Sequence, residues 1–280
     1  MTRDFRELLE QKWADGKFVC VGLDPVFESI PECVRGELSL NNAIAAFSRK
    51  IVNATRDLVC AYKPNIAFYE SYGVGGVYAL AETIGYIHRA APDVPVILDT
   101  KCGDVGSTSE RYVAKIFDEY AADACTISPY LGGCALKPFL DRKDKGIFVV
   151  CRTSNTGADE FQKLVVGEEN IPLYHKVARN VAWQWNTNEN CGLVMGAAHA
   201  YNLRVVRYDA PDIPILIPGI GEQGGDLKEV VAEARSNFIV SSSRSIIYAS
   251  SGSDFADAAR REVQHLHDDI QMYRRVSVPA

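Results

Sequence analysis

Short apolar runs alternate along the chain with segments whose apolar residues follow a helical spacing. Eight runs have the continuous apolar character of strands buried on both faces, namely residues 18–24, 57–63, 94–101, 122–129, 146–154, 191–197, 213–221 and 237–244. Between the second and third runs, Leu80, Ile84 and Ile87 recur every three or four positions, as along one face of a helix. This alternation predicts a parallel sheet covered by helices.

The number of strands favours an α/β fold of the TIM (β/α)8 barrel type, with residues 1–280 forming a single domain. A doubly wound open sheet has the same alternation, but the first run, CVGLDP, lacks the G-x-G-x-x-G expected after the first strand of that fold. The spacing of Phe5, Leu9 and Trp13 predicts an N-terminal helix. The pattern of residues 155–190 predicts an elaborated barrel loop that contains a helix.

Polar residues and glycines gather where the predicted strands end. The first, second, third and fifth runs lead into GLDP, YKPN, LDTKCGD and CRTSN. In barrels of parallel strands the C-terminal ends meet at one face, and that face carries the active site. We therefore expect the chemistry of this chain at the C-terminal mouth of the barrel.

Composition narrows the class of protein. The chain has 280 residues and 47% hydrophobic content, and its 30 Lys and Arg against 36 Asp and Glu give a net charge of −6. This charge argues against a general nucleic-acid surface but permits a locally basic pocket for an anionic metabolite. No signal peptide or membrane-spanning run is expected. Eight cysteines without a C-x-x-C pair indicate free thiols in a reducing cytoplasm.

The stretch LDTKCGDVGST places Asp99, Lys101 and Asp104 within six residues at the end of a strand. In an extended segment Asp99 and Lys101 share a face, because side chains alternate with period two. Lys63, at the end of another run, could add a second ammonium to the same mouth. A lysine flanked by carboxylates keeps its proton, which suits a proton donor better than a Schiff-base nucleophile. Ordinary salt bridges that close the barrel are the alternative interpretation.

Seven motifs occur along the chain, and Asp99, Lys101 and Asp104 belong to the third of them: VGLDP, KPNIAFYE, LDTKCGDVGST, PYLGG, CRTSN, PGIGEQGGD and SSSRSI. In this order they resemble those of orotidine 5'-monophosphate decarboxylases, most closely the branch with K-P-N and R-T-S-N. The resemblance runs from Phe18 to Tyr248. It implies a TIM barrel, a homodimer with active sites at the subunit interface, and conversion of orotidine 5'-monophosphate to UMP and carbon dioxide in pyrimidine biosynthesis. It also implies that no metal or organic cofactor is used.

By this resemblance Lys101 protonates C6 of the pyrimidine as carbon dioxide leaves. Asp99 would lie near the substrate carboxylate, and Lys63 would hold the charged network and the ribose. Asp104 would come from the partner subunit. A preorganised ammonium suits this chemistry, because the leaving carboxylate deposits negative charge on a ring carbon.

The resemblance also assigns five substrate-binding residues. Asp24 would accept from the ribose hydroxyls, although an Asp before Pro is also a common turn former. Ser154 would hydrogen-bond to the polar atoms at the edge of the pyrimidine; the alternative role for this residue is to cap the loop. Thr108 would reach across the dimer to the neighbouring nucleotide, with a helix N-cap as the competing role. Gln223 and Arg244 would bind the phosphate after the seventh and eighth strands, where barrels usually hold that group.

Three positions depart from the pattern of this branch. Cys102 stands where Arg is frequent, Cys134 replaces a commonly acidic residue, and Ser243 precedes the phosphate Arg where many members have Gly. A nucleophilic role for Cys102 is the weaker interpretation, because the expected chemistry needs no thiol. Two other functions remain open: a metal-dependent sugar-phosphate decarboxylase that shares D-x-K-x-x-D, and a catalytically silent nucleotide-binding barrel.

Overall fold

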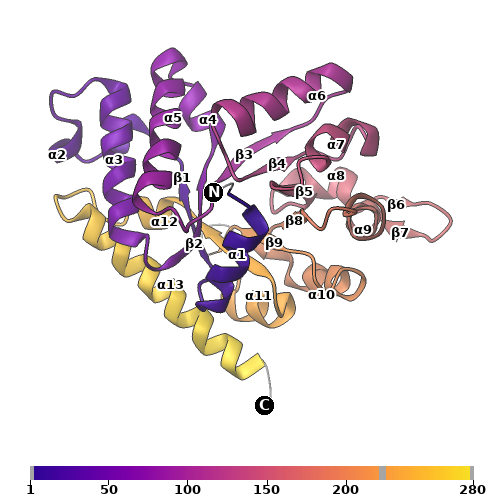
Figure 1. The fold of residues 1–280 in the computed structure, drawn as a ribbon. Helices are drawn as coiled ribbons and strands as arrows, with labels where there is room; N and C mark the ends of the chain where they lie inside the picture. Colours follow the sequence, from indigo (N-terminus) through magenta and orange to yellow (C-terminus); the bar gives the residue numbers. More distant parts are fainter. Residues whose placement is uncertain (1–2, 221–224, 278–280) are drawn as a thin grey trace.

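The computed structural model describes residues 3–220 and 225–277. Eight parallel strands form one sheet at the centre of the molecule, and helices surround it (Figure 1). The strands occupy each of the eight apolar runs of the sequence: β1 (Val19–Leu23), β2 (Val59–Pro64), β3 (Ile97–Cys102), β4 (Ala124–Ile127), β5 (Gly146–Arg152), β8 (Cys191–Met195), β9 (Ile215–Pro218) and β10 (Phe238–Ser242).

The sheet closes into a barrel. Its hydrogen-bonded order is β2-β1-β10-β9-β8-β5-β4-β3, which leaves β2 and β3 at the two ends. Isolated parallel bridges join those ends, pairing Tyr62 with Val96 and Asn65 with Asp99. The predicted (β/α)8 barrel is therefore confirmed, and the open sheet is wrong.

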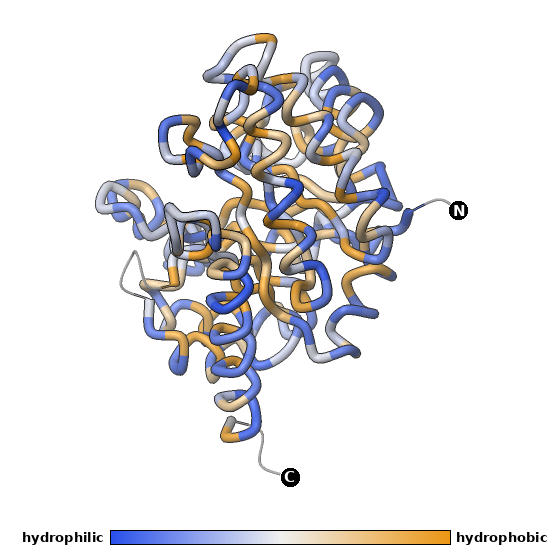
Figure 2. The backbone as a smooth tube through the Cα atoms, turned by 90° about the vertical axis from the view of Figure 1, so that its left-hand side faces the viewer, coloured by the Kyte–Doolittle hydropathy of each residue, from blue (hydrophilic) through white to orange (hydrophobic). Residues whose placement is uncertain are grey.

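Helices follow the strands around the barrel, and their apolar faces pack on it. They are α1 (Phe5–Ala14), α2 (Glu32–Arg35), α3 (Leu40–Thr55), α4 (Ile66–Glu70), α5 (Gly73–Ala90), α6 (Gly106–Val113), α7 (Gly133–Leu140), α8 (Asp159–Gln162), α9 (Leu173–Asn180), α10 (Ala200–Asp209), α11 (Leu227–Ala234), α12 (Arg244–Ile247) and α13 (Phe255–Ser277). Hydrophobic segments concentrate in the middle of the molecule, while the outer helices carry most of the hydrophilic ones (Figure 2). Among the described residues, none of the helices is both long and apolar enough to cross a bilayer.

The segment after β5 is folded rather than a plain loop. It contains α8, a two-stranded antiparallel hairpin of β6 (Val165–Val166) and β7 (Ile171–Pro172), α9 and a π-helical turn over Val181–Trp185. The helix expected from this part of the sequence is present as α9 and its π-helical extension. The hairpin was not predicted.

A second, smaller core fills the inside of the barrel. Every strand of the barrel contributes to it, and α1 adds Phe5 and Leu9; the strand residues are Cys20, Cys60, Ala61, Ile97, Ala124, Phe148, Val194, Leu216 and Ile239. The ring of Phe5 meets that of Phe148 edge-on, with centroids 5.7 Å apart. The barrel is thus a packed core plugged by α1 at its N-terminal end, which leaves the C-terminal end for chemistry.

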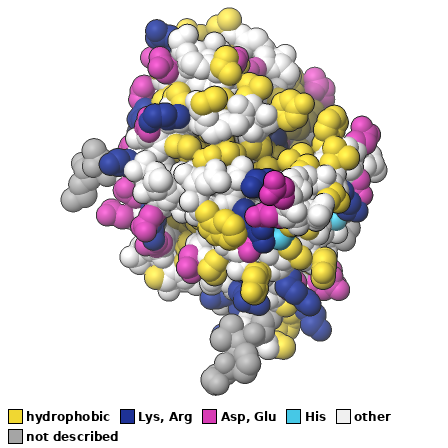
Figure 3. All heavy atoms as spheres, turned by 90° about the vertical axis from the view of Figure 1, so that its right-hand side faces the viewer, with side chains coloured by type: hydrophobic (Ala, Val, Ile, Leu, Met, Phe, Trp, Pro, Cys, Tyr) yellow, Lys and Arg dark blue, Asp and Glu magenta, His cyan; other side chains and the backbone are white. Residues whose placement is uncertain are grey.

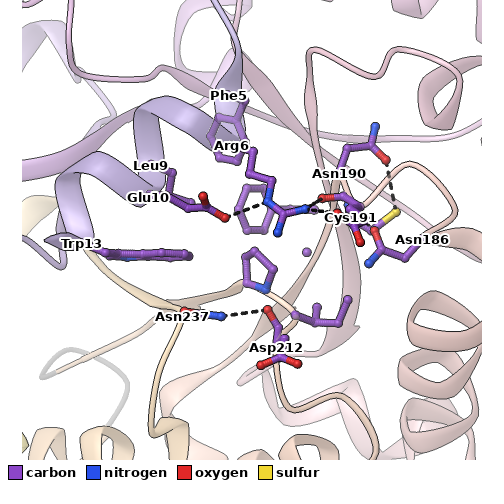
Figure 4. A pocket seen from close by; sticks show the side chains of 15 residues that line it. Phe5, Arg6, Leu9, Glu10, Trp13, Asn186, Asn190, Cys191, Asp212 and Asn237 are labelled. Atoms are coloured by element: carbon purple, nitrogen blue, oxygen red, sulfur yellow. Dashed lines mark hydrogen bonds and ion pairs between the residues drawn. The ribbon is translucent and has the colours of Figure 1, made fainter.

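A cavity of about 290 Å³ lies beside this plug, between α1 and the starts of β8, β9 and β10 (Figure 4). Several of its polar side chains pair with one another or with the backbone: Arg6 with Glu10 and Glu189, and Asn237 with the carbonyl of Asp212. Because the cavity lies at the starts of the strands, it is at the opposite end of the barrel from the charged residues of the predicted site.

Candidate active site

Three of the four predicted catalytic side chains meet at the C-terminal mouth. Asp99 in β3 lies between two ammonium groups, with Lys63 Nζ 3.3 Å from its Oδ2 and Lys101 Nζ 2.6 Å from its Oδ1. The Lys63 and Asp99 side chains are only 6% and 8% exposed, whereas that of Lys101 is 48% exposed. Lys63 and Asp99 are therefore the buried part of the cluster, and the Lys101 ammonium faces the open mouth of the barrel.

The charges within this cluster stabilise one another. Burial alone would raise the pKa of Asp99, but the two neighbouring ammonium groups outweigh it and hold that pKa well below its usual value. Burial would likewise lower the pKa of Lys63, yet the carboxylates of Asp99 and Asp24 raise it instead. Asp99 is thus a fixed carboxylate and Lys63 a fixed ammonium at neutral pH.

The backbone at Lys101 differs from the expected extended strand. Its φ is +45°, in the left-handed region that few residues other than glycine adopt. The β3–β4 pairing also shifts register between Leu98 and Cys102. Asp99 and Lys101 meet as expected, although the backbone at Lys101 is not the regular extended strand on which the period-two argument relied.

In the part of the chain that the structure describes, the Asp104 and Thr108 side chains form no hydrogen bond or ion pair with Lys63, Asp99 or Lys101. The Asp104 carboxylate accepts a hydrogen bond from the backbone N–H of Val105 at 2.7 Å, and no ion pair links it to Lys101 among the described residues. Thr108 is exposed in the first turn of α6. Val105 is the N-cap of that helix, so the proposed N-cap role for Thr108 was wrong.

Asp24 and Ser154 each present a buried oxygen to the mouth. Asp24 follows β1 and is 9% exposed, and neither its Oδ1 nor the Oγ of Ser154 has a hydrogen-bond partner in the part of the chain that the structure describes. Ser154 therefore caps nothing there, contrary to the loop-cap alternative. Unpaired buried oxygens are costly in an empty site and are the kind of group that a polar ligand satisfies.

The loop that carries Ser154 is held from inside the protein. Arg152, at the end of β5, has a fully buried side chain that pairs with Asp159 and donates to Gln162 Oε1 at 3.1 Å. Gln162 Oε1 also accepts from the backbone N–H of Thr153 at 2.8 Å. Arg152 was not predicted to have a role, although an arginine within a strand otherwise buried on both faces is a signal that it has internal partners.

Arg244 begins α12 directly after β10, at the expected end of the barrel. Ser243 precedes it and packs against Gly22 of β1, where an added Cβ would come within 1.8 Å of Ser243 Oγ. The glycine in β1 thus makes room for the serine that departs from the family pattern. Gln223, the second predicted phosphate residue, lies outside the described residues.

Cys102 and Cys134, the other two positions that depart from the motif pattern, affect the charged cluster little. Cys102 is half-buried, and burial raises its pKa, so its thiol is neutral and not activated as a nucleophile. Cys134 is exposed near the start of α7. Within residues 3–220 and 225–277, no group of three or more His, Cys, Asp and Glu side chains has a geometry suited to a metal ion.

Together, fold and cluster define a class of protein: a (β/α)8 barrel with an ammonium–carboxylate–ammonium array at its C-terminal mouth. Residues 17–259 match the model of the orotidine 5'-phosphate decarboxylase / HUMPS family. The chain belongs to this family.

Curated relatives extend the match over nearly the whole chain. The orotidine 5'-phosphate decarboxylase of Herpetosiphon aurantiacus is 47% identical over 88% of this chain and 90% of its own length. That of Thermomicrobium roseum is also 47% identical, over 97% of this chain and 96% of its own.

Two solved structures share the fold closely. Leishmania donovani OMP decarboxylase superposes with a TM-score of 0.81 at 34% identity, covering 97% of this chain and 99% of its own. Leishmania donovani UMP synthase gives a TM-score of 0.84 at 36% identity over 98% of this chain. This chain spans 57% of the length of that synthase.

Proposed function

We propose that this chain is a carbon–carbon lyase that converts orotidine 5'-monophosphate to UMP and carbon dioxide in pyrimidine biosynthesis. The observation that carries the proposal is the Lys63–Asp99–Lys101 cluster, with one ammonium held by a buried carboxylate and facing the mouth. Curated relatives named for this decarboxylation, with identities of 47% over most of the chain, support the same substrate.

Lys101 is the proton donor in this proposal. As the C6–carboxylate bond breaks, its electron pair remains on C6, and the ammonium stabilises that charge before transferring a proton to it. Asp99 keeps the ammonium charged and oriented, and Lys63 balances the charge of Asp99 from the buried side. The products are carbon dioxide, UMP and a neutral lysine that regains its proton from solvent.

Five further residues bind the nucleotide. Asp24 accepts from the ribose hydroxyls and Ser154 pairs with the pyrimidine edge, consistent with the unpaired buried oxygens of both. Arg244 and Gln223 bind the phosphate, and Thr108 contacts the nucleotide of the neighbouring subunit.

The proposal includes a homodimer in which Asp104 and Thr108 are contributed across the interface. Val105, next to Asp104 in the chain, is 56% exposed, and Tyr130 and Leu131, between β4 and α7, are 81% and 45% exposed. Figure 3 shows apolar side chains gathered on the face of the molecule that carries α6 and α7. An exposed apolar patch of this kind is typical of a protein interface.

Residues 1–280 act as one barrel domain in this account, in the cytoplasm, and the reaction needs no metal or organic cofactor. The cytoplasmic location is supported by the eight cysteines, which are all free thiols. A chelator should leave the activity unchanged. Loss of activity with chelator, together with inactivity toward the nucleotide, would instead favour the metal-dependent sugar-phosphate decarboxylase.

The test is an assay of the purified protein, which should reduce the absorbance of orotidine 5'-monophosphate without added metal. Lys101→Ala should nearly abolish this activity, while Lys137→Ala, at an exposed lysine on α7, should leave it intact. UMP binding without release of carbon dioxide would identify a silent nucleotide-binding barrel. Robust turnover by Lys101→Ala would remove Lys101 from its assigned role.

A further inference from the structure

Thr126 lies in β4 against the charged cluster and is 1% exposed. Its hydroxyl oxygen accepts hydrogen bonds from the backbone N–H groups of Thr100 and Lys101, both at 3.0 Å. The same oxygen lies 2.7 Å from Asp99 Oδ1. One hydroxyl thus contacts three consecutive residues of β3, two of which belong to the proposed catalytic cluster.

The hydrogen-bonding capacity of a hydroxyl fixes the direction of these bonds. A threonine hydroxyl has one hydrogen to donate and two lone pairs that accept. Both lone pairs are occupied by the backbone N–H groups, so the hydrogen points to Asp99. The Asp99 oxygen then accepts from Thr126 and from Lys101 at once, as an ionised carboxylate does.

The register of the sheet explains why this hydroxyl is needed. The β3–β4 ladder pairs Leu98 with Cys125 and next pairs Cys102 with Ile127. Three residues of β3, 99–101, therefore face the single residue Thr126 of β4. A bulge of this kind leaves backbone N–H groups without ladder partners, and donors that are partly withdrawn from water need another acceptor. The Thr126 hydroxyl is that acceptor.

We propose that Thr126 is a positioning residue that presets the proton donor. Its hydroxyl holds the bulge in which Lys101 adopts a φ of +45° and fixes the Asp99 carboxylate that aims the Lys101 ammonium. The donor is then in place before the substrate binds, which is the condition for electrostatic preorganisation. This inference rests on the proposed decarboxylation and extends it to a residue that does not touch the substrate.

The test compares three substitutions of Thr126. Thr126→Val keeps the shape and removes the hydroxyl, Thr126→Ser keeps the hydroxyl, and Thr126→Cys supplies a weaker donor and acceptor of similar size. A hydrogen bond to a charged group corresponds to about a 10- to 100-fold effect, so kcat of Thr126→Val should fall by that amount. KM should change little, because the loss acts at the transition state. Thr126→Ser should restore most of the activity.

A pH profile separates positioning from a purely structural role. Asp99 faces Lys63 on β2, Lys101 on its own strand and the buried thiol of Cys20 on β1, whose pKa is raised to about 12. Asp24, after β1, is the other carboxylate that acts on Lys63, and because Thr126→Val leaves it in place, the difference between the variant and the wild type reports on Asp99. Losing a hydrogen bond to its charged form raises its pKa. The acid limb of kcat should therefore lie at higher pH in Thr126→Val than in the wild type.

Thr55→Val is the matched control. Thr55 is fully buried in α3, and its hydroxyl also bonds to two neighbours, Ile51 and Tyr62, rather than to a residue of the charged cluster. It should lose stability but keep kcat and the acid limb. If Thr126→Val does not fold, Thr126→Cys replaces it and should show the same changes to a smaller degree.

The outcomes distinguish this inference from the proposed function. Wild-type kcat and an unshifted acid limb in the folded Thr126→Val or Thr126→Cys variant, beside an inactive Lys101→Ala, would overturn the role of Thr126 alone. A wild-type protein that does not act on orotidine 5'-monophosphate would overturn the function. In that case the carboxyl pKa of Asp99, followed by NMR, still reports whether Thr126 stabilises the charged carboxylate.

Discussion

Replacing Asp99 by asparagine tests whether the charged cluster is a coupled, buried unit. The substitution keeps the size of the side chain and removes the charge that both lysines share. The Lys63 ammonium is the group most affected, since its side chain is 6% exposed and its nitrogen lies 3.3 Å from Asp99. Asp24 remains as a second, partial counter-charge for it.

The magnitude follows from distance and burial. At 3.3 Å two unit charges attract by about 5 kcal/mol at an effective dielectric constant of about 20. Removing one partner of a buried pair costs about 3–5 kcal/mol, which sets the expected loss in the free energy of unfolding. For a chain of 280 residues the unfolding entropy is about 0.6 kcal/mol/K, so Tm should fall by about 5–8 °C.

The loss should depend on pH in a defined direction. In the wild type the folded pKa of Lys63 is raised, so its stabilising contribution is complete below about pH 10.4 and declines as pH rises further. In Asp99→Asn the buried lysine lacks its nearest carboxylate, and burial lowers its pKa. The variant therefore gains stability as pH rises toward about 10.4. The difference between the two proteins should be largest near neutral pH and narrow in alkali.

Urea unfolding followed by circular dichroism at neutral and alkaline pH measures this difference. Asp57→Asn is the control, because it removes a carboxylate from an ion pair with Arg260 whose side chains are 56% and 42% exposed, and exposed pairs contribute less than about 1 kcal/mol. A free energy of unfolding of Asp99→Asn within about 1 kcal/mol of the wild type at neutral pH would show that Lys63 does not depend on this carboxylate.

Three further predictions concern the substrate site and the dimer. Arg244→Ala should lower kcat/KM for the phosphorylated nucleotide and leave that for a phosphate-free analogue almost unchanged; equal losses would contradict a dedicated phosphate site. Gly196→Ala should reduce kcat/KM by about tenfold or more, because its Cβ would lie 1.9 Å from Ser154 Oγ and displace it; unchanged kinetics would remove Ser154 from the site. Mixing inactive Lys101→Ala and Asp104→Ala proteins should restore some activity through heterodimers, and no recovery despite confirmed heterodimers would indicate sites within one chain.

The barrel could be predicted because parallel strands buried on both faces read as continuous apolar runs. All eight runs contain a strand, and their polar ends locate the mouth correctly. The β6–β7 hairpin escaped prediction because its strands have two residues each and are partly exposed, so they show neither the length nor the apolar run of a barrel strand.

The types of residue in the candidate site could be predicted from the sequence, but the conformation of the backbone that carries them could not. Charged residues at a strand end predict a cluster, and Asp99, Lys63 and Lys101 form one. The left-handed backbone of Lys101 arises from a register shift between two strands, which has no signature in the local sequence. Thr126 was overlooked for a related reason, because a β-branched residue in a strand is explained by strand propensity alone.

The central claim is that the Lys101 ammonium, held by a buried carboxylate, protonates the carbon that loses carbon dioxide. A crystal structure with a UMP analogue in the mouth of the barrel tests it most directly. The account predicts that Lys101 Nζ lies about 2.6–3.2 Å from the ring atom at position 6, with Asp99 still bonded to the lysine. A nucleotide bound with that atom out of reach of Lys101, and next to another acid, would contradict it.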